Sequence, residues 1–317
     1  MLFLQSMKKY TSRITSKSIE QSGLPSGYKA IAEYIWNGFD AQATTINIDY
    51  DSNEIGYLNS LSISDNGIGI NLSDIENTFG KFQDSQKAFT FSKTGFIKGK
   101  KGKGRYSFTT FANQSQWDTV FNQDDKNFQY SIIINKEDSQ NYGIQSEKKI
   151  VKTNTGTTVS FEGFFDLFGD QLENETFFDF LAGEFGWFLH LNKQRDYRII
   201  VNGTRIDYNR IIADSEDFET TIIDNKFKIS YVRWSKKIGD KYFNYFLNSN
   251  KIERHRVHTS FNNGAIDFHH SVYVESGYFN DFLPTKIDAP STDKNQQDET
   301  FKLLVSHLKD FISKKEK

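Results

Sequence analysis

The sequence predicts an α/β protein in which helices pack on a mixed sheet, with two domains in series. Helix-like and strand-like apolar periodicities follow one another along the chain, and no internal repeat is visible. With 317 residues the chain is long enough for two separate hydrophobic cores. The composition shifts at the acidic stretch DLFGDQLENE, which begins at Asp166, and we take this stretch as the boundary. We therefore expect one domain at residues 1–168 and a second at residues 169–317.

The first domain is expected to combine an apolar helix with several half-buried strands. After an N-terminal arm, the stretch EYIWNGFDA at residues 33–41 has the apolar content of a packed helix. Polar and apolar residues alternate, as in half-buried strands, in TTINIDYD, YLNSLSIS, FQYSIIIN and TGTTVSFEGF. The stretch SDIE at residues 73–76 has capping-box spacing and predicts a short helix. From Lys81 to Lys103 the chain is polar, basic and dotted with glycine, which predicts a functional lid at about residues 76–106.

The second domain is expected to contain a helix, further strands and a C-terminal helix. The helix TFFDFLAGEFGWFLHL follows the boundary, and RIIVNGTRIDY then predicts a hairpin whose Asn202-Gly203 pair favours a type I′ turn. The stretches FKISYVRW and KYFNYFLN predict two more strands. Near the end of the chain, apolar residues recur at helical spacing, namely Leu304, Leu308, Phe311 and Ile312.

The composition excludes several classes of protein. Cysteine is absent, which excludes disulfides, thiolate catalysis and cysteine-ligated metal sites. The net charge is −2, so no overall charge points to nucleic acid or to a membrane surface, and no run approaches the roughly 18 apolar residues that span a bilayer. The 30 Phe and 15 Tyr against 3 Pro indicate an ordered, aromatic-packed chain. We expect a cytoplasmic protein.

The helix at residues 33–41 carries an unusual polar stripe. Glu33, Asn37 and Asp40 are spaced at i, i+4 and i+7, which puts them within about 20° of one another on a helix. Two carboxylates and an amide stacked in this way call for a cationic or proton-donating group opposite them. A solvated helix face is the alternative explanation for this motif taken alone.

Three further motifs follow in order along the chain. DNGIGI at residues 65–70 comes directly after a predicted strand, so Asp65 should lie at the strand's end, although Asp-Asn-Gly is also a common turn. The loop GKKGKGRYSF can present backbone N–H groups to an anion, but it matches neither a P-loop nor a dinucleotide-binding fingerprint. Gly156-Thr157 opens an otherwise apolar strand.

Taken together in this order, the four motifs resemble those of the GHKL ATPase superfamily, which includes gyrase B, the heat-shock chaperone ATPase, MutL, MORC proteins and histidine kinases. The resemblance covers roughly residues 25–165. It implies a Bergerat-type sandwich that binds ATP and Mg²⁺, followed by an α/β transducer-like domain. The phosphate loop, in which Tyr106 precedes Ser107, departs from the MORC and chaperone pattern and looks more like stand-alone bacterial members.

The resemblance also implies a role for individual residues. Glu33 falls on the general base that activates water, and Asn37 falls on the magnesium ligand. Asp40-Ala41 falls on the Asp-Ala pair that ends the same helical motif. Asp65 falls on the aspartate that accepts a hydrogen bond from the adenine amine. The remaining nucleotide-binding positions are Gly67 and Gly69 beside adenine, Gly99, Gly102, Lys103, Gly104 and Arg105 in the phosphate loop, and Thr157 near adenine.

Elementary chemistry agrees with these roles. Mg²⁺ takes oxygen ligands, and Asn37 offers one without adding negative charge beside a triphosphate. Histidine kinases generally lack the glutamate at the position of Glu33, so a kinase is disfavoured. A transducer lysine that reaches the γ-phosphate would be Lys294, in PSTDKNQQD, in preference to Lys286, in LPTK. The histidines of RHRVH and the pair His269-His270 have no carboxylate at ligand spacing, which disfavours a metal site there.

Two functions remain open at this stage. The first is an ATPase in which ATP closes the lid and drives formation of a homodimer, as a switch in a DNA-transaction or defence system. The second is a nucleotide-gated clamp with negligible turnover that recruits a protein effector. Nucleic acid stays open as a partner because of the basic lid, although the net charge of −2 gives it no support.

Overall fold

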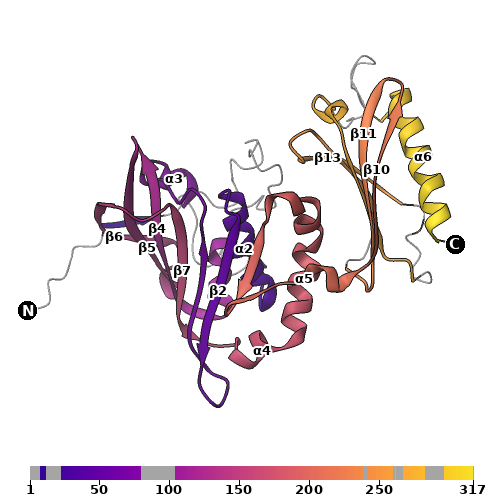
Figure 1. Ribbon diagram of the computed structural model, residues 1–317. Helices are drawn as coiled ribbons and strands as arrows, with labels where there is room; N and C mark the ends of the chain where they lie inside the picture. Colours follow the sequence, from indigo (N-terminus) through magenta and orange to yellow (C-terminus); the bar gives the residue numbers. More distant parts are fainter. Residues whose placement is uncertain are drawn as a thin grey trace, which may run out of the picture. The chain divides into compact units, whose positions relative to one another are not determined.

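The computed structural model describes residues 8–11, 23–79, 104–238, 242–259, 261, 267–282 and 296–316. These residues form two compact units, one ending at Asp207 and the other beginning at Tyr208 (Figure 1). The expected boundary after residue 168 therefore falls inside the first unit. The reason is tertiary, because the segment after residue 168 adds two α-helices and two strands to the first unit.

The described part of the first unit is built on a nine-stranded mixed sheet, in the order β1-β6-β5-β4-β7-β3-β2-β8-β9 (Figure 1). Neighbouring strands are antiparallel except β2 and β8, which are parallel. The strands are β1 (Lys8–Thr11), β2 (Thr45–Ser52), β3 (Leu58–Asp65), β4 (Ala112–Gln123), β5 (Lys126–Asn135), β6 (Asn141–Val151), β7 (Gly156–Phe164), β8 (Arg198–Val201) and β9 (Thr204–Arg205). All four strands predicted for the first domain are present, in β2, β3, β5 and β7.

The helix α2 (Tyr28–Asp40) forms a layer between the sheet and the helix α5 (Glu175–Leu191). On the sheet side, the ring of Tyr34 packs against Phe161 of β7, with centroids 5.0 Å apart. On the other side, Trp36 packs against Phe185 of α5, with centroids 4.7 Å apart. This double packing explains why the helix is apolar almost all round. It begins at Tyr28, several residues before the predicted start.

Shorter helices join these elements. They are η1 (Leu72–Asp74), α3 (Ile75–Thr78), η3 (Gly104–Thr110), η4 (Lys136–Asp138), α4 (Gly169–Glu173) and η5 (Lys193–Arg195). The predicted helix at SDIE is present as η1 and α3. Its cap is Asn71, whose side chain accepts a hydrogen bond from the N–H of Ser73, so the capping residue precedes the expected one. The predicted type I′ turn is confirmed, since Asn202 and Gly203 both have positive φ, 43° and 78°.

The second unit contains a five-stranded mixed sheet in the order β10-β11-β14-β12-β13. Its elements are η6 (Tyr208–Ile211), β10 (Ile212–Ile222), β11 (Asn225–Trp234), β12 (Phe243–Leu247), β13 (Glu253–His258), β14 (His270–Glu275), η7 (Gly277–Phe279) and α6 (Glu299–Glu316). The strands predicted at FKISYVRW and KYFNYFLN are β11 and β12. β12 and β14 are parallel, and the other neighbouring pairs are antiparallel.

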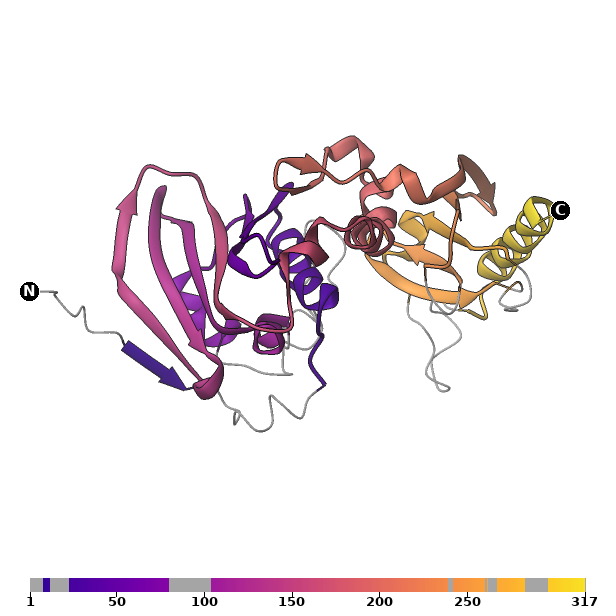
Figure 2. The ribbon, with the colours of Figure 1, turned by 90° about the horizontal axis from the view of Figure 1, so that it is seen from below.

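The helix α6 covers one face of this second sheet (Figure 2). Leu304, Leu308 and Ile312 are buried in the core of the unit, as their spacing predicts, and Phe311 packs at its margin against Phe218 of β10. The fold class is therefore the predicted one, helices on a mixed sheet followed by a second α/β unit. Among the described helices, none is long and apolar enough to cross a membrane.

Candidate functional site

The polar stripe on α2 is half-buried rather than open to solvent. Between Ala30 and Asp40 every residue is buried except Glu33, Asn37 and Asp40, which are half-buried. A solvated helix face would instead be broadly exposed. The stripe is thus the part of an otherwise buried helix that remains accessible to a ligand.

The end of the phosphate loop lies directly against this stripe. A Cβ atom at Gly104 would fall 2.4 Å from Glu33 Oε2, so a larger residue at this position would displace the Glu33 side chain. The following helix, η3, is fixed to α2 by Tyr34, whose hydroxyl donates to the Arg105 carbonyl and accepts from the Phe108 N–H, each at 3.1 Å. Ser107 adds a hydrogen bond from its hydroxyl to the Ala30 carbonyl at 3.2 Å. Two motifs that lie far apart in the sequence therefore meet here.

Asp65 ends β3 on the sheet face that α2 covers. Strand alternation puts its side chain on the same face as the buried Leu61 and Ile63. The Gly67 N–H donates to the Asp65 carboxylate at 2.7 Å, and the backbone of Thr157 donates as well. Burial is the larger effect, and it raises the pKa of Asp65 to about 6. Asp65 is thus a desolvated acceptor that favours a hydrogen-bond donor.

Three glycines allow close backbone packing around Asp65. A Cβ atom at Gly67 would lie 2.5 Å from the Ala41 carbonyl oxygen, and one at Gly156 would lie 2.2 Å from the Asp65 carbonyl oxygen. Gly69 has a φ of +72°, and its Cβ would lie 2.1 Å from the Val120 carbonyl oxygen. These contacts fix the turn after Asp65 against the end of α2, where the stripe also ends.

Thr157 lies beside Asp65 in the sheet, where the two are directly paired residues of β7 and β3. Its hydroxyl is 3.0 Å from that of Thr119 on β4, and the Thr119 hydroxyl accepts from the Ile70 N–H at 2.9 Å. Thr119 was not singled out from the sequence. The signal was present, because it is a polar residue at an inward position between Trp117 and Phe121.

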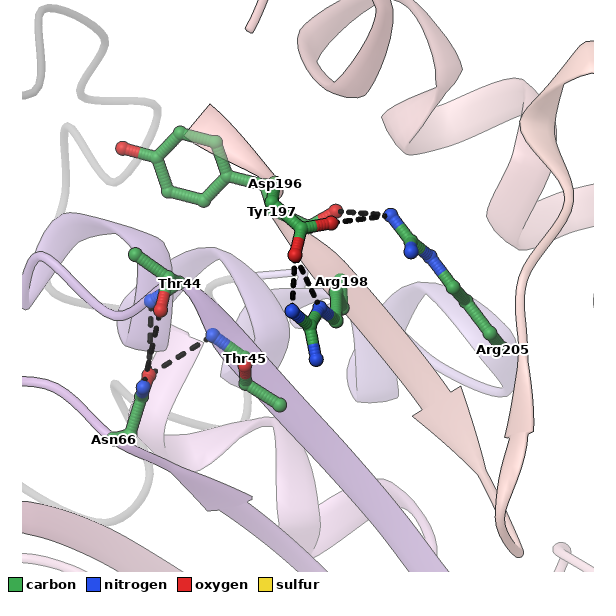
Figure 3. A network of polar contacts seen from close by, with 7 residues as sticks. All are labelled: Thr44, Thr45, Asn66, Asp196, Tyr197, Arg198 and Arg205. Carbon is green, nitrogen blue, oxygen red and sulfur yellow. Dashed lines mark hydrogen bonds and ion pairs between the residues drawn. The ribbon is translucent and has the colours of Figure 1, made fainter. Parts of the chain in front are cut away.

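A second set of polar contacts, made by Asn66, holds the turn after Asp65 to the start of β2 (Figure 3). The side-chain oxygen of Asn66 accepts from the N–H groups of Thr44 and Thr45, at 2.9 Å each. The Thr44 carbonyl accepts in turn from the Arg198 N–H at 2.8 Å, which ties β8 to the same region. Asp196 forms ion pairs with Arg198 and Arg205. The sequence did not indicate these contacts, because those that reach the turn join segments far apart in the chain.

Arg105 has partners other than the predicted phosphate. It is buried, and its guanidinium donates to the carbonyls of Thr78 and Phe79 at 2.6 and 3.0 Å. It also lies over the Tyr106 ring, 4.7 Å from the centroid. In this conformation Arg105 caps the end of α3, so phosphate binding by this residue stays a prediction.

Glu33 also lines a recess between α2 and α5. The recess has a volume of about 240 Å³, and its walls include Lys29, Trp36, Phe180 and Glu184. The Trp36 indole N–H donates to Glu184 Oε1 at 2.8 Å, which links the two helices. The Glu33 side chain thus lies against Gly104 and also lines this recess.

Several predicted positions lie outside the described residues, namely Gly99, Gly102, Lys103, Lys286 and Lys294. The histidines that were judged poor metal ligands lie in the second unit. His269 contacts Tyr242 and Asp267, at 2.7 and 2.6 Å. Within the described residues, no group of three His, Cys, Asp or Glu side chains could hold a metal ion.

Residues 26–158 match the family model described as histidine kinase-, DNA gyrase B- and HSP90-like ATPase. The matched region contains Glu33, Asn37, Asp65 and Thr157, the positions brought together above. This region belongs to the GHKL ATPase superfamily. The GHKL match supports ATP binding and hydrolysis as the general activity of the chain.

Solved structures of similar arrangement include the ATPase region of Saccharomyces cerevisiae topoisomerase II. The form bound to ICRF-187 (dexrazoxane) has 13% sequence identity and a TM-score of 0.42, with 78% of this chain and 73% of that chain covered. A second structure of the same region has 12% identity and a TM-score of 0.41, with 78% and 72% covered. No curated protein matches the chain.

The side chains of the GHKL site fit an adenine nucleotide with magnesium. Asp65 provides a desolvated acceptor with a raised pKa, and Asn37 provides a half-buried amide oxygen on the same accessible stripe as Glu33. Gly104 lies against the Glu33 side chain. Mg²⁺ requires hard oxygen ligands, and the adenine amine requires a hydrogen-bond acceptor.

Proposed function

We propose that this chain is a magnesium-dependent ATPase in which ATP closes the lid and brings two copies together. The observation that carries the proposal is the convergence of the stripe on α2 with the turn after Asp65 and with Gly104. Each contact has its own physical reason, and together they bring three separate motifs against one helix of an otherwise apolar layer. The experiment that tests the proposal is the release of phosphate from ATP by the purified protein.

The adenine end of the nucleotide is assigned to Asp65. Its pKa of about 6 leaves the carboxylate ionised at pH 7 although it is largely desolvated. A desolvated carboxylate gains strongly from a neutral N–H donor, and the exocyclic amine of adenine is such a donor. Guanine presents no amine at that edge. The site should therefore prefer ATP to GTP.

The phosphate end is assigned to Asn37 and Glu33. Asn37 would hold Mg²⁺ through its amide oxygen, and the ion would neutralise phosphate charge. Glu33 lies one helical turn earlier and would accept the proton of the attacking water. Its side chain lies against Gly104, at the end of the loop that would face the phosphates. General-base assistance of this kind contributes about 10² to 10⁴ in rate.

Replacement of Glu33 by Gln tests this assignment. The amide keeps the size of the side chain but removes its basicity, so ATP should still bind while phosphate release falls by about 10² to 10⁴. Glu162→Gln is the matched control, because Glu162 is exposed on β7. Turnover of Glu33→Gln at the parental rate would place the base elsewhere. If the parent binds ATP without releasing phosphate, the protein is the nucleotide-gated clamp instead.

The proposal also includes closure of the lid and coupling of ATP hydrolysis to the second unit. The predicted lid at about residues 76–106 includes Gly104, and the contact of Gly104 with Glu33 supports a lid that acts on the proposed catalytic carboxylate. A lysine from the second unit would offset charge on the γ-phosphate, and Lys294 is preferred to Lys286. Lys294→Ala should slow hydrolysis strongly with little change in ATP affinity, and Lys286→Ala should do less. The reverse ranking would move this role to Lys286.

Dimerisation follows from the same proposal and has its own measurement. The mass of the Glu33→Gln variant should double when ATP and Mg²⁺ are added, because hydrolysis no longer resets the closed state. Sedimentation with and without nucleotide measures this change. A monomer under both conditions would remove dimerisation from the proposal. A role in a DNA transaction or in defence, a protein effector and a cytoplasmic location stay predictions.

A further inference from the structure

Tyr34 directly follows the proposed base on α2, but its side chain is buried between the helix and the sheet. The residue is only 3% exposed, and its ring packs edge-on against Phe161 of β7. Burial raises the pKa of the Tyr34 hydroxyl well above its usual value, so the hydroxyl keeps its proton at neutral pH. Tyr34 therefore offers one donor and one acceptor inside the apolar layer.

The hydroxyl of Tyr34 bonds two main-chain groups of η3. It donates to the Arg105 carbonyl and accepts from the Phe108 N–H, each at 3.1 Å. In a 3₁₀-helix a carbonyl pairs with the N–H three residues later, so these groups are the two partners of one helical hydrogen bond. Tyr34 bonds both partners, and it thereby fixes the spacing of the turn that begins at Arg105.

The same end of η3 contacts the proposed base. Gly104 directly precedes Arg105, and a Cβ atom at Gly104 would lie 2.4 Å from Glu33 Oε2 and 3.2 Å from Glu33 Cβ. Two successive side chains of α2, Glu33 and Tyr34, therefore meet the first turn of η3. Because the contact at Gly104 is so close, a small shift of this turn would also shift the Glu33 carboxylate.

The adenine end of the proposed site is held by other groups. Asp65 ends β3 and accepts from the Gly67 N–H at 2.7 Å and from the backbone of Thr157. These donors belong to the turn after β3 and to β7, whereas the Tyr34 hydroxyl bonds η3. Loss of that hydroxyl should therefore affect Glu33 and spare Asp65.

We propose that Tyr34 is a positioning residue for ATP hydrolysis, because its hydroxyl sets the first turn of η3 and with it the place of the Glu33 carboxylate. The inference rests on the proposed function, since it takes Glu33 as the general base. A misplacement of about 1 Å at a reacting group can cost about 100-fold in rate. Tyr34 thus acts on the reaction through its neighbour without contact with the nucleotide.

Tyr34→Phe removes the hydroxyl and keeps the ring against Phe161. The Arg105 carbonyl and the Phe108 N–H can then bond each other, so both stay satisfied and the fold should be retained. The turn would tighten, however, and Gly104 would move relative to the proposed base. The expected result is a change in turnover with little change in stability.

Phosphate release from ATP by the purified full chain, together with calorimetric titration of a non-hydrolysable ATP analogue, tests the proposal. Tyr34→Phe should lower kcat by about 10- to 100-fold, while the affinity for the analogue stays close to that of the parent. Tyr28→Phe is the matched control. Tyr28 is also on α2 and its hydroxyl also donates to a backbone carbonyl, that of Gln171 in α4 at 2.8 Å. Tyr28→Phe should keep the parental kcat.

A second comparison separates positioning from a general loss of structure. In the Glu33→Gln background the base is already lost, so the addition of Tyr34→Phe should lower kcat no further, whereas independent effects would multiply. Ser107→Ala gives an independent test. It removes the hydrogen bond from η3 to the Ala30 carbonyl, at 3.2 Å, and keeps Tyr34 in place. It should also lower kcat.

The outcomes that overturn this inference differ from those that overturn the proposed function. Parental kcat in Tyr34→Phe, with parental circular dichroism, would overturn the positioning role alone. An affinity for the analogue that falls as much as kcat, or losses that multiply in the double variant, would exclude action through Glu33. If Tyr34→Phe does not fold, parental kcat in Ser107→Ala overturns the inference. A parent that releases no phosphate would overturn the inference and the proposed ATPase together.

Discussion

Replacing Asp65 by Asn should stabilise the first unit while it abolishes ATP binding. The carboxylate of Asp65 lies on the helix-covered face of the sheet, where burial outweighs its two backbone hydrogen bonds. Asn has nearly the same shape and keeps an oxygen that can accept from the Gly67 N–H, but it carries no charge. Its amide nitrogen would however face the adenine amine, donor against donor. Stability and binding should therefore change in opposite directions.

The size of the effect follows from the pKa. The pKa of Asp65 rises from 3.8 to about 6, and about two units at about 1.36 kcal/mol each correspond to about 3 kcal/mol. Because the folded protein holds this proton more tightly than the unfolded chain, the cost is complete above pH 6 and disappears below pH 3.8. After allowance for partial solvent exposure, Asp65→Asn should gain about 2 to 3 kcal/mol at pH 8 and almost nothing at pH 3.5.

Urea denaturation followed by circular dichroism at pH 8 and pH 3.5 measures the difference, and calorimetric titration at pH 8 measures ATP affinity. Asp49→Asn is the matched control, because Asp49 is exposed on the adjacent strand β2 and its replacement should change neither quantity. A variant at Asp65 that is less stable than the parent at pH 8 would refute the argument from burial. A variant that binds ATP with parental affinity would refute the assignment of adenine to Asp65.

Three further predictions follow from the same site. ATP affinity should be constant above pH 6 and fall about tenfold for each pH unit below it, because Asp65 must be ionised to bind adenine. Calorimetric titration with ATP measures this dependence. An affinity at pH 5 equal to that at pH 8 would contradict the prediction. Gly69→Ala should destabilise the protein by about 3 kcal/mol or more in urea denaturation, because the added Cβ would collide with the backbone at Val120. Gly203 has a similar φ but open space around it, so Gly203→Ala should cost only about 1 kcal/mol. Equal costs for the two variants would exclude the collision. Arg105→Met should cost about 2 to 4 kcal/mol by the same assay, because it leaves two carbonyls without their donor; a neutral effect would show that Arg105 does not support α3.

The sequence predicted the fold class and the core of the candidate site because the signals are local. Glu33, Asn37 and Asp40 share a stripe through helical periodicity alone, and Asp65 ends a strand whose alternation is visible in the sequence. The meeting of these motifs was predicted only through the resemblance to a known family. Periodicity could not have placed Gly104 against Glu33, because it describes each element separately and the two residues lie far apart in the sequence.

The features that were missed depend on contacts between distant segments. β8 pairs with β2 although most of the sequence of the first unit lies between them. Because of this parallel pairing, the first unit extends to Asp207. β10 escaped notice because its exposed edge position removes the apolar alternation that marks a strand, leaving Phe218 and Ile222 at its inner positions. For Arg105, the sequence showed a cation beside a glycine loop. The carbonyl groups at the end of α3 that bind it lie in a different segment.

The link between α2 and α5 has a consequence for spectroscopy. Trp36 lines the same recess as Glu33, and its indole N–H is bound to Glu184, so its emission depends on the charge and hydration next to the proposed base. Trp187 is stacked at 5.9 Å from Trp36, close enough for the two indoles to exchange excitation energy. The protein therefore contains an intrinsic fluorophore pair beside its candidate catalytic glutamate, and ligand binding can be followed in unlabelled protein through the emission of Trp36.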